Sequence, residues 1–272
     1  MPELPEVETV VRGLRRHILG ETFGAVSFAS RRVGLANARG WKSRTNGEQV
    51  GQIARLGKYI IVRFTSGNAL VIHLRMTGRL WIKPPSYHRE RHDRFVLPLT
   101  DGRQLVLSDA RQFGRIDWLE PYLLERHRGI SKLGPDALTI TKAQFAAICS
   151  KSHRPIKSFL LDQTRLAGLG NIYADESLFA ARIHPEAFTD SISPHRLERL
   201  RLGMITILQN AIDACGTTFD TFSDLEGEAG GFSPQLKVYQ RTGMPCADCR
   251  SAIRRIVLSG RSTHFCPRCQ KF

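Results

Sequence analysis

Four cysteines near the end of the chain form its most specific chemical pattern. They occur as two C-x2-C pairs, Cys246 with Cys249 and Cys266 with Cys269, separated by sixteen residues. Two such pairs can close a tetrahedral zinc site of four thiolates. His264 is a further candidate ligand that the site does not need, and a catalytic zinc would keep an open position for water. We therefore predict one structural Zn²⁺ per chain.

Two disulfides or four free thiols are the alternative reading of these cysteines. Two intervening residues leave little room for an easy disulfide within each pair. Turn-forming residues, Gly243, Pro245 and Pro267, also surround both pairs. The pattern favours zinc.

The charge of the chain indicates an anionic partner. Lys and Arg number 40 against 25 Asp and Glu, a formal net charge of +15. Between Lys237 and Phe272 there are eight basic residues and one acid, Asp248, and four thiolates with one zinc would leave about +5 there. Nucleic acid is the first partner to consider, because binding phosphates releases counterions. Ribosomal, membrane-surface and ordinary soluble proteins can be equally basic, so charge alone does not decide.

Length and composition bound the class of protein. With 272 residues and 42% hydrophobic content, we expect two domains plus the zinc element. No apolar run follows the acidic, proline-rich N-terminus, and no segment reaches the roughly 18 apolar residues of a membrane span. We expect a soluble intracellular protein without a membrane partner, in which Cys149 and Cys215 are small buried residues.

Periodicity predicts an α+β fold. Helical spacing predicts a helix from Pro5 to Leu19, with acids in its first turn that complement the helix dipole. Short apolar runs then predict antiparallel strands packed as a sandwich, at 58–64, 69–74, 94–99, 104–108 and 115–119. Helical spacing returns at 141–150, 155–162, 171–181 and 194–215.

These patterns divide the chain into three parts. We predict a β-sandwich domain over 1–131, a helical domain over 132–236 and a zinc hairpin over 237–272. The segment 217–235 is rich in Gly, Ser, Thr and acids, so we expect a mobile loop there.

Six motifs in order resemble the formamidopyrimidine-DNA glycosylases, the Fpg family of oxidised-purine repair enzymes. They are MPELPEVET (1–9), GKY (57–59), HLRMTG (73–78), DARQFG (109–114), GLGNIY (168–173) and GRSTHF (260–265) with its cysteines. The motifs span the whole chain. The resemblance implies a β-sandwich, a helical domain with a helix-two-turn-helix element, and a zinc hairpin.

The resemblance implies that Met1 is removed and that the amine of Pro2 attacks C1′ of a damaged nucleotide. An α-amine has a pKa of about 8 against about 10.4 for lysine, so more of it is unprotonated near neutral pH. The resulting iminium would carry both base excision and strand cleavage, leaving a one-nucleotide gap flanked by phosphates. Taken alone, Pro2 would be interpreted as a helix-start residue.

Two glutamates follow the nucleophile. By resemblance Glu3 is the general acid and base for the opening sugar, and Glu6 orients the N-terminal segment. Both could instead only complement the helix dipole.

The resemblance also implies a set of DNA contacts. Lys58 and Arg261 join the catalytic set as phosphate-holding cations, and Asn171 holds phosphate as an amide donor. Alone, Lys58 would be a surface lysine and Asn171 a helix N-cap. The remaining assignments are His92 and Lys157 as DNA contacts, with Glu176 and Tyr239 in supporting positions.

Three further residues match those that fill the space left by an extruded base. Phe113 can wedge between base steps, Met76 can fill an irregular hole, and Arg111 can offer donors to the orphaned base. Core packing is the alternative role for Met76 and Phe113. Arg111 and Phe113 would lie on one side of an extended segment.

Three positions depart from the family pattern. Asp220 stands in the lesion loop where a Lys or Arg is common, and Gln240 and Arg250 replace glycines. Asp220 would repel phosphate, which bears on DNA affinity and on lesion preference.

The sequence therefore predicts a bifunctional glycosylase and lyase acting as a cytoplasmic bacterial monomer on duplex DNA with oxidised bases or abasic sites. An endonuclease VIII-like enzyme for oxidised pyrimidines is the nearest alternative, but that branch begins Pro-Glu-Gly-Pro, and here Leu4 replaces the glycine. A zinc-containing module that only binds DNA is the alternative from another class. The sequence gives no ranking of lesions, opposite-base preference, rate-limiting step or accessory partner.

Overall fold

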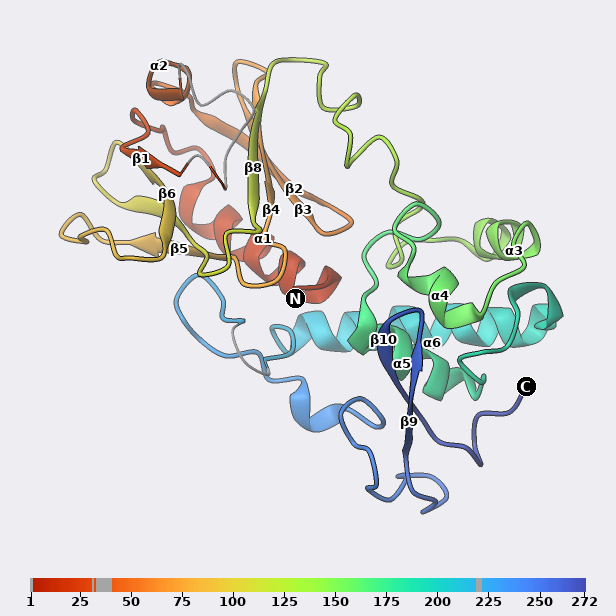
Figure 1. Ribbon diagram of the computed structural model, residues 1–272. Helices are drawn as coiled ribbons and strands as arrows, with labels where there is room; N and C mark the ends of the chain where they lie inside the picture. The colour runs from red at the N-terminus through yellow and green to blue at the C-terminus, as the bar shows by residue number, and fades with distance from the viewer. Residues whose placement is uncertain (1, 31, 33–40, 219–221) are drawn as a thin grey trace. The chain divides into compact units, whose positions relative to one another are not determined.

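The structure is a computed structural model that describes residues 2–30, 32, 41–218 and 222–272 (Figure 1). The chain divides into two compact units. The first comprises Met1–Ser131 with Ala214–Gly231, and the second comprises Lys132–Asp213 with Phe232–Phe272. Pro2 and Glu3 thus belong to the first unit, and the four cysteines belong to the second.

Helix α1 (Leu4–Ile18) begins the first unit and matches the predicted helix. A proline stands in its first turn, and Glu3 and Glu6 form a reciprocal capping box at its N-terminus. Its apolar face is fully buried, with Val11, Leu14 and Ile18 at 0% exposure. This packing fixes the direction in which the chain's N-terminus points.

Two four-stranded antiparallel sheets form the sandwich of the first unit. One has the order β1-β6-β7-β5, with β1 (Phe28–Ala29), β6 (Asp93–Pro98), β7 (Gln104–Ser108) and β5 (Arg79–Lys83). The other has the order β2-β3-β4-β8, with β2 (Val50–Leu56), β3 (Tyr59–Phe64), β4 (Ala69–His73) and β8 (Arg115–Leu119). The inner faces and α1 share one core, to which Ile60, Leu70, Phe95 and Leu107 belong.

Strand β3 is buried on both faces, which explains its continuous apolar sequence. Ile60 and Val62 face the shared core, whereas Ile61 lies in a second cluster with Val71 and Leu124. The chain after β8 therefore covers the outer face of this sheet. A short helix, α2 (Trp41–Thr45), precedes β2.

The predicted strands are present, but periodicity missed the two-residue β1 and also β2 and β5. Strand β2 contains Gly51 and Gln52, both exposed. Strand β5 contains Arg79 and Lys83, and both lie over the ring of Trp81, at 6.0 and 4.4 Å from its centroid. Polar side chains therefore interrupt the apolar pattern where these strands face outward.

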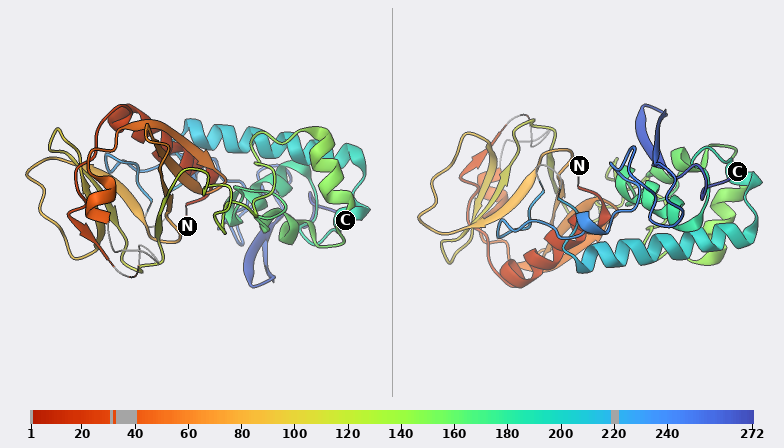
Figure 2. Two further views of the ribbon diagram at one scale, coloured as in Figure 1. Left: turned by 90° about the horizontal axis from the view of Figure 1, so that it is seen from above. Right: turned by 90° about the horizontal axis from the view of Figure 1, so that it is seen from below.

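The second unit is helical and ends in a hairpin. Its helices are α3 (Lys142–Ser150), α4 (Ile156–Leu161), α5 (Asn171–Ala181) and α6 (Pro194–Asp213), with 3-10 turns η1 (Thr189–Ser191) and η2 (Ser233–Gln235). Strands β9 (Arg254–Leu258) and β10 (Arg261–Phe265) pair antiparallel. Both views in Figure 2 show this hairpin projecting from the helices of its unit. The fold class is the predicted one.

The segment Ala214–Gly231 differs from the prediction, which placed it with the helical domain. It packs in the first unit, where Leu225 is 3% exposed and belongs to the shared core. The Leu225 side chain lies so close to Gly13 of α1 that a Cβ added at Gly13 would be 2.8 Å from Leu225 Cδ1. Among the described residues, no helix is long and apolar enough to cross a lipid bilayer.

Candidate active site

The turn before α1 buries Pro2 and Glu3. Glu3 is 3% exposed, and its backbone N–H donates to Glu6 Oε2 at 2.8 Å. The Glu3 side chain in turn accepts from the backbone of Glu6. A carboxyl group is thus held at the positive end of a helix, beside the residue predicted to be the nucleophile.

Glu6 connects this turn to a distant segment. Its second oxygen, Oε1, accepts the backbone N–H of Thr217 at 2.8 Å. Gly216 adopts φ +86° beside it, and a Cβ there would lie 3.0 Å from the Glu6 side chain. The one carboxylate therefore joins the N-terminal turn to the start of the 214–231 segment, and only glycine fits comfortably at Gly216.

Lys58 lies in the tight turn between β2 and β3 and is only 5% exposed, unlike an ordinary surface lysine. Arg55 anchors this turn by donating to the carbonyl of Gly57 and to Glu8 Oε2, both at 3.0 Å. Glu8 is on α1, so a partly buried ion pair links the Lys58 turn to that helix. Sequence reasoning gave Glu8 only a dipole role and missed this contact.

His73 supports the loop that carries Met76. Its Nδ1 accepts the backbone N–H of Arg75 at 3.0 Å, where Arg75 adopts φ +55°. Burial, with the positive charges of Arg75 and Lys58, lowers the pKa of His73 to about 3. A neutral imidazole with an unprotonated Nδ1 therefore shapes this loop near neutral pH. The HLRMTG motif contained His73, but nothing in the sequence assigned it this task.

The predicted void-filling residues are not core residues. Met76 is half-buried between β4 and β5, and Phe113 is 47% exposed. The guanidinium of Arg111 lies over the Phe113 ring, 4.8 Å from its centroid. The two side chains do share a side, but the segment is not extended as predicted, because Gln112 between them adopts φ +59°.

A cavity of about 280 Å³ opens beside these loops. Thr77 and Ala110, the chain neighbours of Met76 and Arg111, contribute to its lining, as do Trp81 and His92. His92 is exposed, and its carbonyl accepts the backbone N–H of Asp109 at 2.8 Å. The backbone thus places His92 near the Arg111 loop.

In the second unit, Asn171 and Lys157 converge on the strand that carries Arg261. Asn171 Nδ2 and Lys157 Nζ each donate to the carbonyl of Ser262 at 2.9 Å. Arg261 precedes Ser262 and is exposed. Asn171 is the first residue of α5 and Gly170 is its N-cap, so the N-cap role considered for Asn171 is wrong.

Lys157 does not reach the surface. Its side chain is 1% exposed, and Nζ lies 2.6 Å from Asp175 Oδ1 and 2.8 Å from Thr263 Oγ1. Asp175 Oδ2 accepts the backbone N–H of His264 at 2.8 Å. A direct DNA contact by Lys157 does not fit this burial. The ammonium group instead fixes β10 against α4 and α5.

Glu176, the next residue of α5, holds the chain before the cysteines. Its carboxylate accepts the backbone N–H groups of Lys237, Val238 and Tyr239 at 2.8–2.9 Å. Burial raises the pKa of this carboxyl above its usual value, and the three amide donors offset only part of that rise. The Tyr239 ring packs edge-on against His264, with 5.1 Å between centroids.

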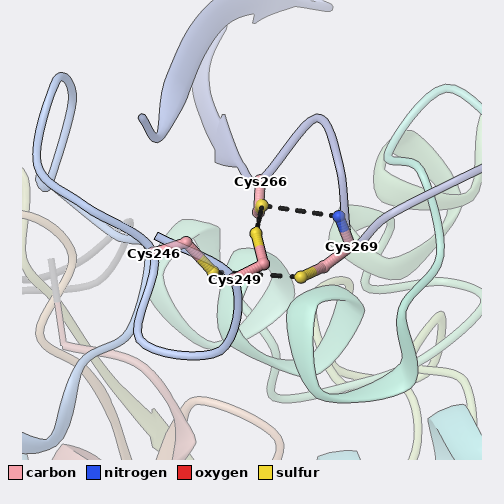
Figure 3. A group of neighbouring side chains, drawn as sticks. All are labelled: Cys246, Cys249, Cys266 and Cys269. Carbon is pink, nitrogen blue, oxygen red and sulfur yellow. Dashed lines mark hydrogen bonds between the residues drawn. The ribbon is translucent and has the colours of Figure 1, made fainter. Parts of the chain in front are cut away.

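The four cysteines lie together, as Figure 3 shows. Their sulfur atoms are all within 4.8 Å of one another, with Cys246 and Cys269 at 3.9 Å and Cys249 and Cys266 at 3.4 Å. Zn–S bonds of about 2.3 Å place tetrahedral sulfurs about 3.8 Å apart, so the four residues fit one Zn²⁺. His264 is engaged by Asp175 instead, so the four-cysteine prediction is confirmed.

The remaining cysteines differ from each other. Cys149 is fully buried as expected, and burial raises the pKa of its thiol to about 12. Cys215 is exposed, contrary to the prediction. It adopts φ +58° in the turn after α6, where the chain leaves the helix.

The backbone conformation explains why the family pattern has glycine at positions 240 and 250. Gln240 and Arg250 adopt φ +57° and +65°, the left-handed region that glycine enters freely. Asp220 and Met1 lie outside the described residues.

Family models match three parts of the chain. They are the formamidopyrimidine-DNA glycosylase N-terminal domain over residues 1–116, the formamidopyrimidine-DNA glycosylase H2TH domain over 133–223, and a zinc finger found in FPG and IleRS over 243–271. The matches follow the β-sandwich, the helices and the hairpin in order.

Full-length relatives agree with these models. A formamidopyrimidine-DNA glycosylase of Ligilactobacillus salivarius is 38% identical over 99% of both chains. Lactococcus lactis Fpg, solved with abasic-site DNA, is 36% identical with a TM-score of 0.92, covering 99% of this chain and all of the other. MutM, solved with DNA containing carbocyclic 8-oxo-G, is 35% identical with a TM-score of 0.91 over both whole chains.

Proposed function

The chain belongs to the formamidopyrimidine-DNA glycosylase family, and from this premise we propose that it excises oxidised purines through an N-terminal proline Schiff base and cleaves the strand by β,δ-elimination. It is a bifunctional glycosylase and lyase by family. We propose 8-oxoguanine, formamidopyrimidines and abasic sites in duplex DNA as its substrates.

The buried turn before α1 carries this proposal. Pro2 and Glu3 are both buried there, and Glu3 caps the helix. Once Met1 is removed, the positive end of α1 would disfavour a protonated amine at Pro2. More of the amine is then free to act as a nucleophile.

The reaction would proceed through a covalent intermediate between Pro2 and the sugar. The Pro2 nitrogen bonds to C1′ while the bond from C1′ to the base breaks, and the base leaves with the proton that the Pro2 nitrogen gives up. Glu3 protonates the ring oxygen, the sugar opens, and an iminium forms between Pro2 and C1′. The Glu3 carboxylate then takes a 2′ proton as the 3′ phosphate leaves. A second elimination loses the 4′ proton as the 5′ phosphate leaves. Water then hydrolyses the iminium and releases Pro2.

Both units would supply DNA contacts. In the first unit Lys58 would bind a phosphate of the DNA, and in the second unit Arg261 and Asn171 would bind phosphates. Met76, Arg111 and Phe113 would occupy the space of the extruded base, and His92 would contact the backbone nearby. Lys157, Glu176 and Tyr239 would act indirectly by holding the hairpin.

Zinc would have a structural task. The four cysteines would hold the ion, which ties the 246–249 turn to the end of β10 when bound. Arg254, Arg255 and Arg261 are exposed on the hairpin, and Arg254 and Arg261, which share one face by the strand register, would contact phosphates. The interface would therefore weaken steeply as salt rises.

Single-turnover cleavage with borohydride trapping on matched duplexes tests the proposal. We expect a trapped adduct and cleavage on duplexes with 8-oxoguanine opposite cytosine, and none on an undamaged duplex. Trapping on oxidised-pyrimidine duplexes but not on 8-oxoguanine would assign the chain to the endonuclease VIII-like branch instead. The protein must carry an untagged N-terminus.

Two variants separate an enzyme from a binding module. Glu3→Gln should bind the lesion duplex like the parent but excise at least about 100-fold more slowly, a typical effect of losing a general acid. Pro2→Gly keeps an α-amine but loses the ring, so adduct yield should fall while DNA binding remains. Unchanged cleavage in both variants would show that Pro2 and Glu3 do not carry the reaction, and a parent that binds the lesion duplex without cleaving it would be a binding module.

A further inference from the structure

We propose that the buried carboxylate of Asp109 is a positioning residue that holds the Met76 loop and the Arg111–Phe113 loop in one fixed arrangement. The inference rests on the proposed function, because it concerns the residues assigned there to the void left by the extruded base. Asp109 itself would touch neither the lesion nor the reacting sugar. Neither the sequence motifs nor the resemblance gave it a task.

The hydrogen bonds to Asp109 join the two loops. Oδ1 accepts the hydroxyl of Thr77, next to Met76, at 2.5 Å and the backbone N–H of Arg111 at 3.2 Å. Oδ2 accepts the backbone N–H of Gly114, next to Phe113, at 2.7 Å. One carboxylate therefore binds Arg111 directly and binds the chain neighbours of the other two predicted void-filling residues, Met76 and Phe113.

The surroundings allow this carboxylate little freedom. Asp109 is 0% exposed. A Cβ at Gly114 would lie 3.1 Å from Oδ2, so glycine permits the close approach. The backbone of Asp109 is also fixed, because its N–H donates to the carbonyl of His92 at 2.8 Å and its carbonyl accepts from Arg94 Nε at 2.9 Å.

The donors to the carboxylate explain why an aspartate is required. Two are backbone amides and one is a hydroxyl, and they approach both oxygens. An asparagine would present an N–H₂ group to one of them, placing donor against donor in a buried site. The affected loop would move, and since both loops bind the same group, a shift of one would be transmitted to the other.

This arrangement predicts a selective defect. Extruding a stacked, paired 8-oxoguanine needs the void to be filled, whereas an abasic nucleotide has no base to unstack. Disturbing Asp109 should therefore slow excision from 8-oxoguanine opposite cytosine much more than cleavage at a preformed abasic site. A merely structural defect would reduce both rates together.

The experiment compares both single-turnover rates, corrected for folded fraction, in the parent, Asp109→Asn, Thr77→Val and Thr77→Ser. We expect Asp109→Asn to lower the ratio of 8-oxoguanine to abasic rates by about tenfold or more, the effect of about one or two buried hydrogen bonds. Thr77→Val should lower it about threefold to tenfold, and Thr77→Ser, which keeps the hydroxyl, should restore it.

Asp93 offers a matched control. It is a buried carboxylate, 2% exposed, in the same sheet region, and it accepts from Tyr87 Oη at 2.6 Å and from the Glu90 N–H at 2.8 Å. Asp93→Asn should leave the ratio of rates unchanged, whatever it costs in stability.

Three results bear on the inference. If the parent is active and Asp109→Asn, Thr77→Val and Asp93→Asn all keep the parent's ratio of 8-oxoguanine to abasic rates, the inference is overturned and the proposed function stands. A parent that cleaves neither duplex would overturn the proposed function, and this inference with it. If Asp109→Asn fails to fold, an unchanged ratio in Thr77→Val still contradicts the inference.

Discussion

In the second unit the hairpin that carries Arg261 is held by a buried ion pair and four cysteines in addition to carboxylates that accept backbone amides, whereas in the first unit such carboxylates hold the loops near Glu3 and Met76. The hairpin depends on the Lys157–Asp175 pair at 2.6 Å and on four cysteines. Glu6 and Asp109 instead accept backbone N–H groups, at 2.8 Å from Thr217 and 2.7 Å from Gly114.

The difference matches the tasks of the two regions. A hairpin of five-residue strands has little apolar core of its own, so an ion and a buried ion pair must replace it. The loops of the first unit pack on a large core, so their hydrogen bonds need only fix the orientation of the backbone. Hydrogen bonds fix orientation at a modest net free energy, whereas an unpaired buried charge is costly.

Removing the metal should have the largest effect. Cys266→Ser or a strong chelator should release one zinc per chain and unfold the hairpin, because structural zinc contributes an apparent ~10–16 kcal/mol in small zinc-binding domains. Metal analysis, limited proteolysis and DNA binding would follow the loss. Cys215→Ser is the matched control, since that cysteine is exposed and outside the cluster. A variant that loses zinc yet keeps DNA affinity would contradict this account of the hairpin.

Breaking the buried ion pair should rank second. Lys157→Met leaves Asp175 charged and buried, which typically costs about 3–5 kcal/mol of unfolding free energy. Adding Asp175→Asn should recover part of that loss, because the uncompensated charge is gone and an acceptor for the His264 amide remains. Urea unfolding measures both variants. A loss below about 1 kcal/mol for Lys157→Met would mean that charge does not fasten this hairpin.

His73 predicts a smaller effect that depends on pH in the first unit. Its folded pKa is about 3 and its unfolded pKa about 6.5, so between these values only the unfolded chain binds the proton. Stability should therefore fall as pH drops through this window, by up to about 1.4 kcal/mol per pH unit and about 2 kcal/mol from pH 7 to 5.

His73→Asn tests that contribution because it keeps an acceptor for the Arg75 amide but does not titrate. Urea unfolding at pH 7 and pH 5 should show a smaller loss of unfolding free energy in this variant than in the parent, because the two proteins share all other titrating groups. Equal losses would place His73 among groups that protonate freely in the folded state.

The sequence predicted what local patterns determine. The spacing of the cysteines identified the metal site, and the apolar stripe of α1 identified that helix. The same reasoning missed contacts that join distant residues. A buried lysine looks like any other until Asp175 is brought to it from another helix, and Glu8 gave no sign of Arg55.

The exposure of a residue was predictable only where apolar and polar residues alternated regularly. Cys215 was expected to be buried because cysteines usually are, but it lies where the chain leaves α6 at a positive φ. Strand β5 was missed because the charged groups of Arg79 and Lys83 lie over the ring of Trp81. Such packing leaves no alternation of apolar and polar residues to read.

Mass spectrometry of the borohydride-trapped complex tests the central claim most directly. After digestion of protein and DNA, the sugar remnant should be found on the N-terminal peptide, attached to the nitrogen of Pro2, with Met1 absent. The same peptide should be unmodified after incubation with undamaged duplex. A remnant on a lysine side chain such as Lys58, or trapping by protein that retains Met1, would contradict the account.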